Sequence, residues 1–304
     1  MIKEKIEYLS HFIGNTPLLK ISVKYAGVLK DIYVKCEWYN FSGSIKDRAS
    51  LGMLKNYPQI ESCKEICEVT SGNMGISLSA LGAYLDLKVT IFMPKSMSEE
   101  RKKLISLYGA TLILCDDFAD CFAKAEKYAS EHDAFYCRQF ENENNSLAQQ
   151  ALGYEILKDC SAKCFVSGVG TSGTLSGAGS ILKENGYKIV AIDPASSSLL
   201  TLGYSNGQHK IQGLSDGIIP KLYDRNLVDQ IIPITDEDAI AMAQKLNALG
   251  IPCGISGGAN FLGAVLCDEK TIATVFPDDN KKYLSTDLSK KSSTNLVDQI
   301  EILI

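Results

Sequence analysis

A single lysine, Lys46, stands where a strand-like run, Ile32–Cys36, gives way to a helix-like run, Lys46–Tyr57. Between them, Asn40-Phe-Ser-Gly-Ser-Ile-Lys-Asp-Arg48 forms a turn rich in small residues, in which Ser44 is a plausible N-cap. The first turn of a helix disfavours a second positive charge, so we expect a lysine there to lose its proton readily. An amine must be neutral to form a Schiff base with a carbonyl compound.

Three glycine turns also precede helix-like runs, and two of them, Thr70–Gly75 and Gly168–Thr174, follow a predicted strand. Thr70-Ser-Gly-Asn-Met-Gly75 carries hydroxyl and amide donors, and Gly254-Ile-Ser-Gly-Gly258 carries a neutral hydroxyl at Ser256. Gly168-Val-Gly-Thr-Ser-Gly-Thr174 has the features of an anion cradle at a helix N-terminus. Its glycines, with Asp193 ending the next strand, also match a dinucleotide fingerprint, so an NAD-binding oxidoreductase is a remote alternative. The many hydroxyls favour a terminal phosphate ester instead.

The elements around these turns alternate between strand-like and helix-like runs, which predicts an α/β fold with mostly parallel sheets. In such sheets, ligands collect at the carboxyl ends of the strands, where Lys46 and the turns Thr70–Gly75 and Gly168–Thr174 are predicted to lie. The predicted strands are Ile32–Cys36, Glu65–Val69, Val89–Met93, Thr111–Cys115, Cys164–Val169, Ile189–Ile192, Gln230–Ile234 and Ile272–Phe276. The predicted helices are Lys46–Tyr57, Ile76–Leu85, Glu99–Leu107, Phe118–Ala129, Leu175–Leu182 and Asp236–Leu249.

Length and composition narrow the class of protein. With 304 residues, 45% of them hydrophobic, the chain can bury two cores, and its net charge of −5 gives no reason to expect nucleic acid or a membrane surface as a partner. We find no secretory signal and no apolar run as long as a membrane span. The ten cysteines lack the spacing of a zinc site, so we expect no metal and a reducing, cytoplasmic location.

Together, the lysine, the Asn-bearing turn, the phosphate cradle and the isolated serine match the needs of pyridoxal 5′-phosphate (PLP). The order and wording of these motifs resemble the cysteine synthase/cystathionine β-synthase family of PLP enzymes, and the resemblance runs from Gly14 to Ser285. The motifs that carry it are Gly14-Asn-Thr-Pro-Leu18, Gly43–Arg48, Thr70–Asn73, Met93-Pro94, Glu100-Arg101, Gln139-Phe140, Gly170–Thr174, Ile211–Gly213, Gly254–Ser256 and Tyr283-Leu-Ser285.

The resemblance implies a fold type II, tryptophan-synthase-β-like architecture with two α/β domains, and commonly a homodimer. We expect a smaller mobile domain at residues 37–143 and a larger, phosphate-binding domain from residues 1–36 plus 144–304. By the same resemblance, Lys46 binds the cofactor aldehyde, Asn73 the 3′ oxygen and Ser256 the ring nitrogen. The implied phosphate site is Gly170, Thr171, Ser172, Gly173 and Thr174. The implied substrate-carboxylate site is Thr70, Ser71, Gln139 and the backbone N–H of Met74.

Two departures from the family pattern bear on the substrate. Met74 stands where the family usually has threonine, which removes a hydroxyl donor. Asp216, in Gln212-Gly-Leu-Ser-Asp-Gly217, stands where cysteine synthases have a small apolar residue. A carboxylate there would face the substrate and could repel sulfide, bind an ammonium group, or act as base for water or a thiol. A loop aspartate turned to solvent is the alternative.

The activity implied is β-replacement on a three-carbon amino acid through an aminoacrylate, with sulfur as nucleophile or leaving group. Synthesis of cysteine from O-acetylserine and sulfide is the family default. The alternative, motivated by Asp216, is a cysteine-consuming enzyme that releases hydrogen sulfide and makes serine or lanthionine. The second substrate is then sulfide, a thiol or water, and the catalytic residues are Lys46 and Asp216.

Overall fold

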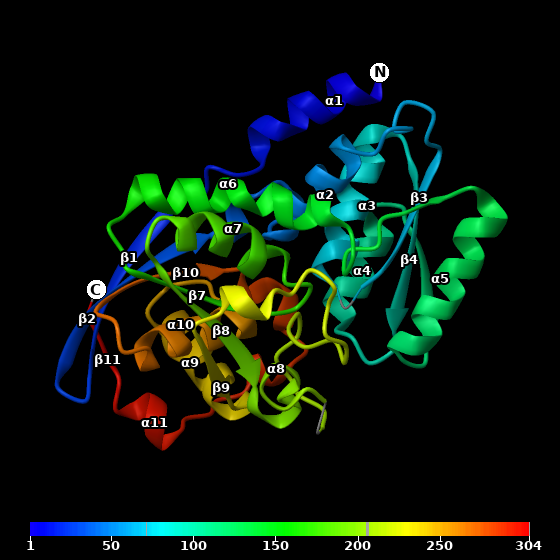
Figure 1. The fold of residues 1–304 in the computed structure, drawn as a ribbon. Coiled ribbons are helices and arrows are strands. Elements are labelled where there is room, and N and C mark those ends of the chain that lie inside the picture. Colours follow the sequence, from blue (N-terminus) through cyan, green and yellow to red (C-terminus); the bar gives the residue numbers. More distant parts are fainter. Residues whose placement is uncertain (71, 205–206, 304) are drawn as a thin grey trace.

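The protein folds into two α/β units, each built on its own sheet, and they lie side by side in Figure 1. The structure is a computed structural model that describes residues 1–70, 72–204 and 207–303. Strands of the two sheets alternate with helices along most of the chain, as the sequence pattern predicts. The α/β fold class with mostly parallel sheets is therefore confirmed.

Within the described residues, the larger sheet has seven strands in the order β11-β1-β2-β10-β7-β8-β9. β2, β10, β7, β8 and β9 run parallel, whereas β1 pairs antiparallel with both β2 and β11. The strands of this sheet are β1 (Leu18–Tyr25), β2 (Val28–Cys36), β7 (Cys164–Gly168), β8 (Lys188–Pro194), β9 (Gln230–Ile234), β10 (Thr271–Phe276) and β11 (Glu301–Leu303).

The smaller sheet is parallel throughout, in the order β5-β4-β3-β6. Its strands are β3 (Glu65–Val69), β4 (Lys88–Pro94), β5 (Thr111–Cys115) and β6 (Phe135–Tyr136). The helices of the chain are α1 (Ile2–Leu9), α2 (Lys46–Lys55), α3 (Asn73–Leu85), α4 (Glu99–Leu107), α5 (Phe118–His132), α6 (Glu143–Asp159), α7 (Gly173–Glu184), α8 (Leu199–Leu202), α9 (Asp236–Ala248), α10 (Ile255–Leu266) and α11 (Asn295–Asp298).

Short 3₁₀ turns connect several of these elements: η1 (Ser10–Phe12), η2 (Glu37–Tyr39), η3 (Ala195–Ser197), η4 (Arg225–Leu227), η5 (Asn280–Tyr283) and η6 (Asp287–Ser289). The predicted strands agree with the structure to within one or two residues, except that β2 begins four residues earlier than predicted. β1, β6 and β11 were not predicted. α6 begins inside the polar run Glu141–Ser146, which the composition alone suggests as a domain boundary.

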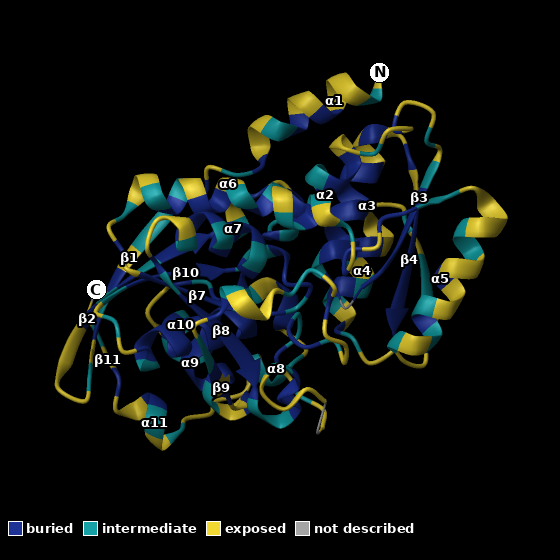
Figure 2. Cartoon of the chain, in the orientation of Figure 1, coloured by how far each residue is buried: buried dark blue, intermediate teal, exposed yellow. Residues whose placement is uncertain are grey.

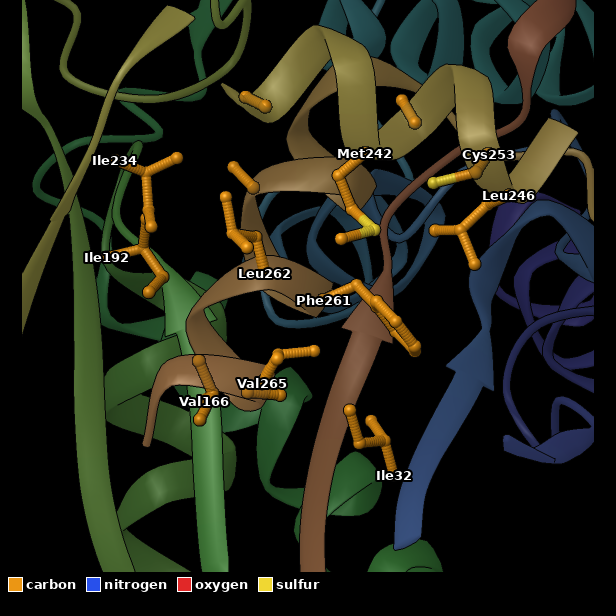
Figure 3. Close-up of a cluster of buried hydrophobic side chains, with 14 of the residues drawn as sticks. Ile32, Val166, Ile192, Ile234, Met242, Leu246, Cys253, Phe261, Leu262 and Val265 are labelled. Atoms are coloured by element: carbon orange, nitrogen blue, oxygen red, sulfur yellow. The ribbon is translucent and has the colours of Figure 1, made fainter. Parts of the chain in front are cut away.

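Apolar side chains fill both faces of the larger sheet. Figure 3 shows one of these cores, where Ile32, Val166 and Ile192 of the strands face α9 and α10. On the opposite face, α6 and α7 pack through Leu152, Leu175 and other apolar residues. The buried interior and exposed outer helix faces in Figure 2 follow from this layering.

A separate core forms around the smaller sheet. It takes Ile6 and Leu9 from α1, Ala49 and Met53 from α2, and Ile66 from β3, among others. The N-terminal helix therefore packs on the smaller unit. The predicted boundaries, 37–143 for one domain and 1–36 plus 144–304 for the other, stay a prediction.

Close packing of α6 on α7 positions the loop that precedes α7. A Cβ atom at Gly177 would lie 2.0 Å from the carbonyl oxygen of Ser146, and one at Gly153 would lie 2.9 Å from the carbonyl oxygen of Ala178. Only glycine permits this approach, because real Cβ atoms do not come within 3.0 Å of such atoms. The start of α7, and the loop before it, is thus held against α6.

A buried charge cluster joins α2, α6 and the end of β2. The Arg48 guanidinium donates to Glu37 from Nε (2.7 Å) and to Glu155 from Nη1 (2.6 Å), and Thr16 donates its hydroxyl to Glu37 at 2.7 Å. The Lys35 Nζ atom lies 2.9 Å from Oε2 of Glu155. Glu37, Arg48 and Lys35 are almost fully buried, so each charge depends on its partners.

Candidate active site

One cleft collects the residues that the sequence singled out. It lies where the carboxyl ends of β3, β7 and β10 meet the N-termini of α2, α3, α7 and α10. Ser71, which was predicted to bind substrate, lies outside the described residues. The predicted residues that line the cleft are Lys46, Thr70, Asn73, Met74, Gln139, Gly170, Thr171, Ser172, Gly173, Thr174, Asp216 and Ser256.

Lys46 is the first residue of α2, so its amine lies at the positive end of the helix dipole. The N-cap residue is Ile45, and the hydroxyl of Ser44, the predicted N-cap, accepts the N–H of Lys46 at 3.3 Å. Burial lowers the pKa of the Lys46 amine, and the charges of Asp216 and Glu68 oppose this shift without cancelling it. The site therefore favours the neutral amine that Schiff-base chemistry requires.

The loop before α7 has the form of an anion cradle. Ser172 adopts a left-handed conformation (φ 65°), and its side chain does not cap the helix but meets the Ser176 hydroxyl at 2.9 Å. The N–H of Gly173, the first residue of α7, donates to the Thr171 hydroxyl at 3.3 Å, and the Ser172 side chain leaves the rest of the helix N-terminus uncapped, as an anion site requires. A Cβ atom at Gly170 would lie 2.2 Å from the Gly213 carbonyl oxygen, so a side chain there would displace the neighbouring loop.

A polar network lines the opposite wall of the cleft. Asn73 donates from Nδ2 to the buried carboxylate of Asp278 at 2.7 Å, and its Oδ1 is buried with no hydrogen-bond partner among the described residues. The Tyr283 hydroxyl lies 2.9 Å from the same Asp278 oxygen. Asn73 at the start of α3 and Ser256 in the first turn of α10 line one cavity, although they belong to different units.

The predicted carboxylate-binding residues are held by backbone contacts. Gln139 donates from Nε2 to the Val69 carbonyl at 2.6 Å, and its own N–H donates to the Glu68 carboxylate at 3.0 Å. Thr70 accepts the Gly72 N–H at 2.9 Å. The Met74 thioether lies 3.1 Å from the Ser50 hydroxyl in the core of the smaller sheet, so only its backbone is left to meet a substrate.

Asp216 borders both the cleft and a wider cavity of about 550 Å³ that adjoins it. The cavity runs between the β4–α4 and β5–α5 loops of the smaller unit and the 207–217 segment of the larger. Asp216 is partly buried, and its charge partly offsets the lowering of the Lys46 pKa by burial. Asp216 and Lys46 therefore line the same cleft.

Helix α4 joins the two units across this cleft. The Arg101 guanidinium donates to Gln212 at 2.5 Å and to the Tyr283 hydroxyl at 2.8 Å. The Glu100 carboxylate accepts the N–H and hydroxyl of Ser285. These contacts hold the smaller unit against the larger one directly beside Asn73 and Asp278.

Sequence reasoning missed three buried residues at this site. Glu68 accepts the N–H of Val69 and Gln139, and burial raises the pKa of its carboxyl to about 8. Asp278 binds Asn73, and Asn145 donates to Thr171 and to the Gln139 carbonyl. Glu68 is a charged residue inside a predicted strand, and Asp278 is a charged residue two positions after one. Both placements in the sequence indicate a polar site at the strand ends.

The residues present fit PLP. Asn73 lines the cleft, and its Oδ1 has no hydrogen-bond partner among the described residues, so it could accept a hydrogen bond from a bound hydroxyl. The cradle before α7 suits the phosphate ester, Lys46 the aldehyde, and Ser256 the ring nitrogen. The dinucleotide alternative fits less well, because the Asp193 carboxylate is buried and already accepts the N–H and hydroxyl of Thr201.

In the described part of the chain, no helix is both long and apolar enough to cross a membrane. No three His, Cys, Asp or Glu side chains gather there as a metal site would require. All ten cysteines are free thiols.

Comparison with known proteins agrees with this geometry. Residues 9–278 match the family model described as "Pyridoxal-phosphate dependent enzyme". Cysteine synthase B of Campylobacter jejuni is 40% identical over 298 residues, which cover 93% of this chain and 98% of the relative.

Two solved structures are also similar, each with 40% identity. A hydrogen sulfide-producing enzyme from Fusobacterium nucleatum superposes with a TM-score of 0.92, covering 99% of both chains. An aspartate-to-asparagine variant of that enzyme, complexed with an α-aminoacrylate intermediate, superposes with a TM-score of 0.94 and covers 99% of this chain and 98% of the other. The chain thus belongs to the pyridoxal-phosphate dependent enzymes of fold type II, in the group of the cysteine synthases.

Proposed function

We propose that the protein is a β-replacement enzyme that releases hydrogen sulfide from cysteine, with water or a second thiol as the incoming nucleophile. The observation that carries the proposal is the Asp216 carboxylate, which borders the cleft of Lys46 closely enough to affect the pKa of its amine. A negative charge there disfavours an anionic sulfide as nucleophile and suits a base for a neutral one. The similar hydrogen sulfide-producing enzyme from F. nucleatum supports the same direction.

Each side chain of the cleft has a proposed role. The Gly170–Thr174 loop binds the cofactor phosphate, Asn73 its 3′ oxygen and Ser256 its ring nitrogen. Bound PLP supplies the electron sink that acidifies the substrate α-carbon. Thr70, Ser71, Gln139 and the N–H of Met74 bind the substrate carboxylate.

Two groups move protons in this scheme. The neutral Lys46 amine takes the α-proton, and the Asp216 carboxylate takes a proton from the incoming water or thiol. The sulfur leaves as hydrogen sulfide, so cysteine and water give serine and hydrogen sulfide, and two cysteines give lanthionine and hydrogen sulfide. Atoms and charges balance in both cases without an oxidant.

Asp216→Asn tests the proposal. With cysteine as the only amino acid, we expect sustained sulfide release from the parent protein and a loss of ~10²-fold in the variant, because an amide cannot accept the proton. Cofactor content should not change. Asp116→Asn is the matched control, since that aspartate borders the same cavity but is exposed and paired with Lys95. Equal sulfide release from the parent and Asp216→Asn would refute the role of Asp216.

Cysteine synthesis from O-acetylserine and sulfide is the second candidate. It is supported by the 40% identity to the C. jejuni cysteine synthase B over nearly the whole chain. Both activities use the same first half, in which a β-substituent is expelled. A parent protein that is silent with cysteine alone, but turns over O-acetylserine and sulfide, would favour this candidate over sulfide release.

We also propose that the protein forms a homodimer. Four exposed aromatic rings follow one another on the surface: Tyr8 lies 5.4 Å from Phe12, Phe12 lies 6.4 Å from Phe41, and Phe41 lies 6.2 Å from Tyr84, measured between centroids. Contiguous exposed apolar surface is typical of interfaces. Light scattering should give twice the chain mass of 33.1 kDa, and less for Phe12→Glu. A parent mass of one chain would contradict the proposal.

A cytoplasmic location is proposed as well, because ten unpaired thiols are typical of a reducing compartment. Disulfides in protein isolated with its thiols blocked would speak against it.

A further inference from the structure

The residue before Asp216 has an unusual backbone conformation. Ser215 has φ 45°, in the left-handed region, and is 9% exposed. The glycines on either side, Gly213 and Gly217, have φ 94° and 81° at little cost, whereas a serine with its Cβ atom is strained there. Strain of this kind persists only where the surrounding structure imposes it, and it is a reason to look for function.

Three hydrogen bonds impose the conformation of Ser215. Its N–H donates to the Val169 carbonyl at 2.9 Å, and its hydroxyl donates to the Ser197 carbonyl at 3.2 Å. Its own carbonyl lies 3.0 Å from Nε2 of His209. Val169 directly follows β7 and precedes the phosphate loop, so the serine is tied to the same scaffold that is proposed to hold the cofactor.

The contact with His209 defines the tautomer of that ring. Because a carbonyl oxygen can only accept, Nε2 must carry the proton and donate it. Nδ1 is buried and has no hydrogen-bond partner among the described residues. His209 is partly buried and borders the wide cavity next to Asp216, and its contact with the Ser215 carbonyl holds the peptide leading into Asp216.

We propose that Ser215 and His209 are positioning residues that aim the Asp216 carboxylate at the reacting end of the cleft. The Ser215 carbonyl belongs to the peptide bond with Asp216. The His209 contact therefore fixes the orientation of that peptide plane, and with it the direction in which the Asp216 side chain projects. The inference rests on the proposed function of Asp216 as a base. By placing the Asp216 carboxylate, these two residues determine whether the cleft releases sulfide from cysteine.

His209→Ala removes the donor, whereas His209→Gln retains an N–H donor of similar reach. We expect His209→Ala to lower kcat for sulfide release from cysteine by ~10- to 100-fold, the cost of misplacing a catalytic group by about 1 Å, with KM for cysteine unchanged. His209→Gln should restore most of the rate. His132→Ala is the matched control, because that exposed ring also bonds a carbonyl, of Tyr128 at 3.0 Å, far from the cleft.

A second variant and a second measurement keep the test independent of folding and of turnover. Ser215→Gly relieves the strain, so it should fold at least as stably as the parent and still lose sulfide release, because the hydroxyl contact is gone. Hydrogen exchange of peptides covering residues 211–217 should quicken in His209→Ala but not in His132→Ala, since the Ser215 N–H bond to Val169 loosens.

The outcomes separate this inference from the proposed function. If Asp216→Asn lowers sulfide release while His209→Ala and Ser215→Gly stay within about twofold of the parent, Asp216 is the base and the positioning role is wrong. If His209→Gln is as impaired as His209→Ala, the hydrogen bond is not the cause and the inference is also wrong. If Asp216→Asn has no effect on sulfide release, Asp216 is not the base, and the positioning role inferred from it is wrong as well.

Discussion

Replacing Lys46 with alanine is expected to leave the protein without a covalently bound cofactor and to lower turnover by at least about 10³-fold. The lysine is the first residue of α2, in a cleft whose burial lowers the pKa of its amine, and it is proposed both to hold PLP and to take the substrate proton. Intact mass after borohydride reduction should show a cofactor adduct on the parent chain and none on Lys46→Ala.

Lys55→Ala is the matched control for this prediction. Lys55 ends the same helix, is exposed, and pairs with Glu7 at 3.0 Å, so its loss should change neither the adduct nor the rate. An adduct of unchanged mass and yield on Lys46→Ala would show that another amine binds the cofactor. Lys282, which is buried and donates to the Gly43 carbonyl at 2.7 Å, is the residue to examine in that event.

Arg48→Met is expected to cause the largest loss of stability, about 3–5 kcal/mol in the free energy of unfolding. The guanidinium is the shared partner of Glu37 and Glu155 in the buried cluster, and its hydrogen bonds and charge help to bring the pKa of Glu155 down to about 2. Methionine keeps much of the volume but leaves the fully buried Glu37 without its cation. Urea unfolding, followed by circular dichroism, measures the difference.

Arg138→Met is the control for a charge pair that contributes little. Arg138 pairs with Glu126 on the surface, with both side chains about half exposed, so we expect a change of about 0–1 kcal/mol. The double variant Arg48→Met/Glu37→Gln should recover part of the loss, because it removes the unpaired buried charge. If Arg48→Met were no more destabilising than Arg138→Met, the buried cluster would not support the junction of α2, α6 and β2.

Much of the fold could be predicted from the sequence because the parallel strands are buried on both faces. Cys164–Val169 and Ile272–Phe276 were predicted to within one residue of the observed ends of β7 and β10, since short apolar runs bounded by polar residues are typical of such strands. β1 was not predicted, although the alternation of polar and apolar residues in Leu18–Tyr25 is typical of a strand with one buried face, and the structure pairs it antiparallel with β2. β11 and β6 are two or three residues long and depend on their sheets for definition.

Helix α6 was missed for another reason. Its first turn, from Glu143, is polar, and its buried residues include Asn145 and Gln149, so the apolar period that predicts a helix is interrupted. Asn145 donates to the hydroxyl of Thr171, which lines the cleft, and Gln149 donates to the Ile45 carbonyl just before α2. The apolar periodicity did not predict this helix because polar contacts near the site take the place of apolar packing at Asn145 and Gln149.

By itself, the sequence determined which chemistry-bearing residues exist and in which local setting each one lies. Lys46 at a helix start, the glycine cradle before α7 and Ser256 after Gly254 are local features, because capping, turn formation and the helix dipole act over a few residues. The sequence also placed Lys46 and the glycine cradle after predicted strands, and hence at the ligand-binding edge of a sheet.

Only the tertiary structure decided how distant residues meet. It brought Asn73 to Asp278, Gln139 to Glu68, and His209 and Val169 to Ser215, and it packed the Met74 thioether against the Ser50 hydroxyl. These contacts depend on the packing of two sheets and on burial, which sets the cost of each unpaired polar group and the pKa of each buried one. Sequence spacing carries no information on either quantity, so the site's partners could be read only from the fold.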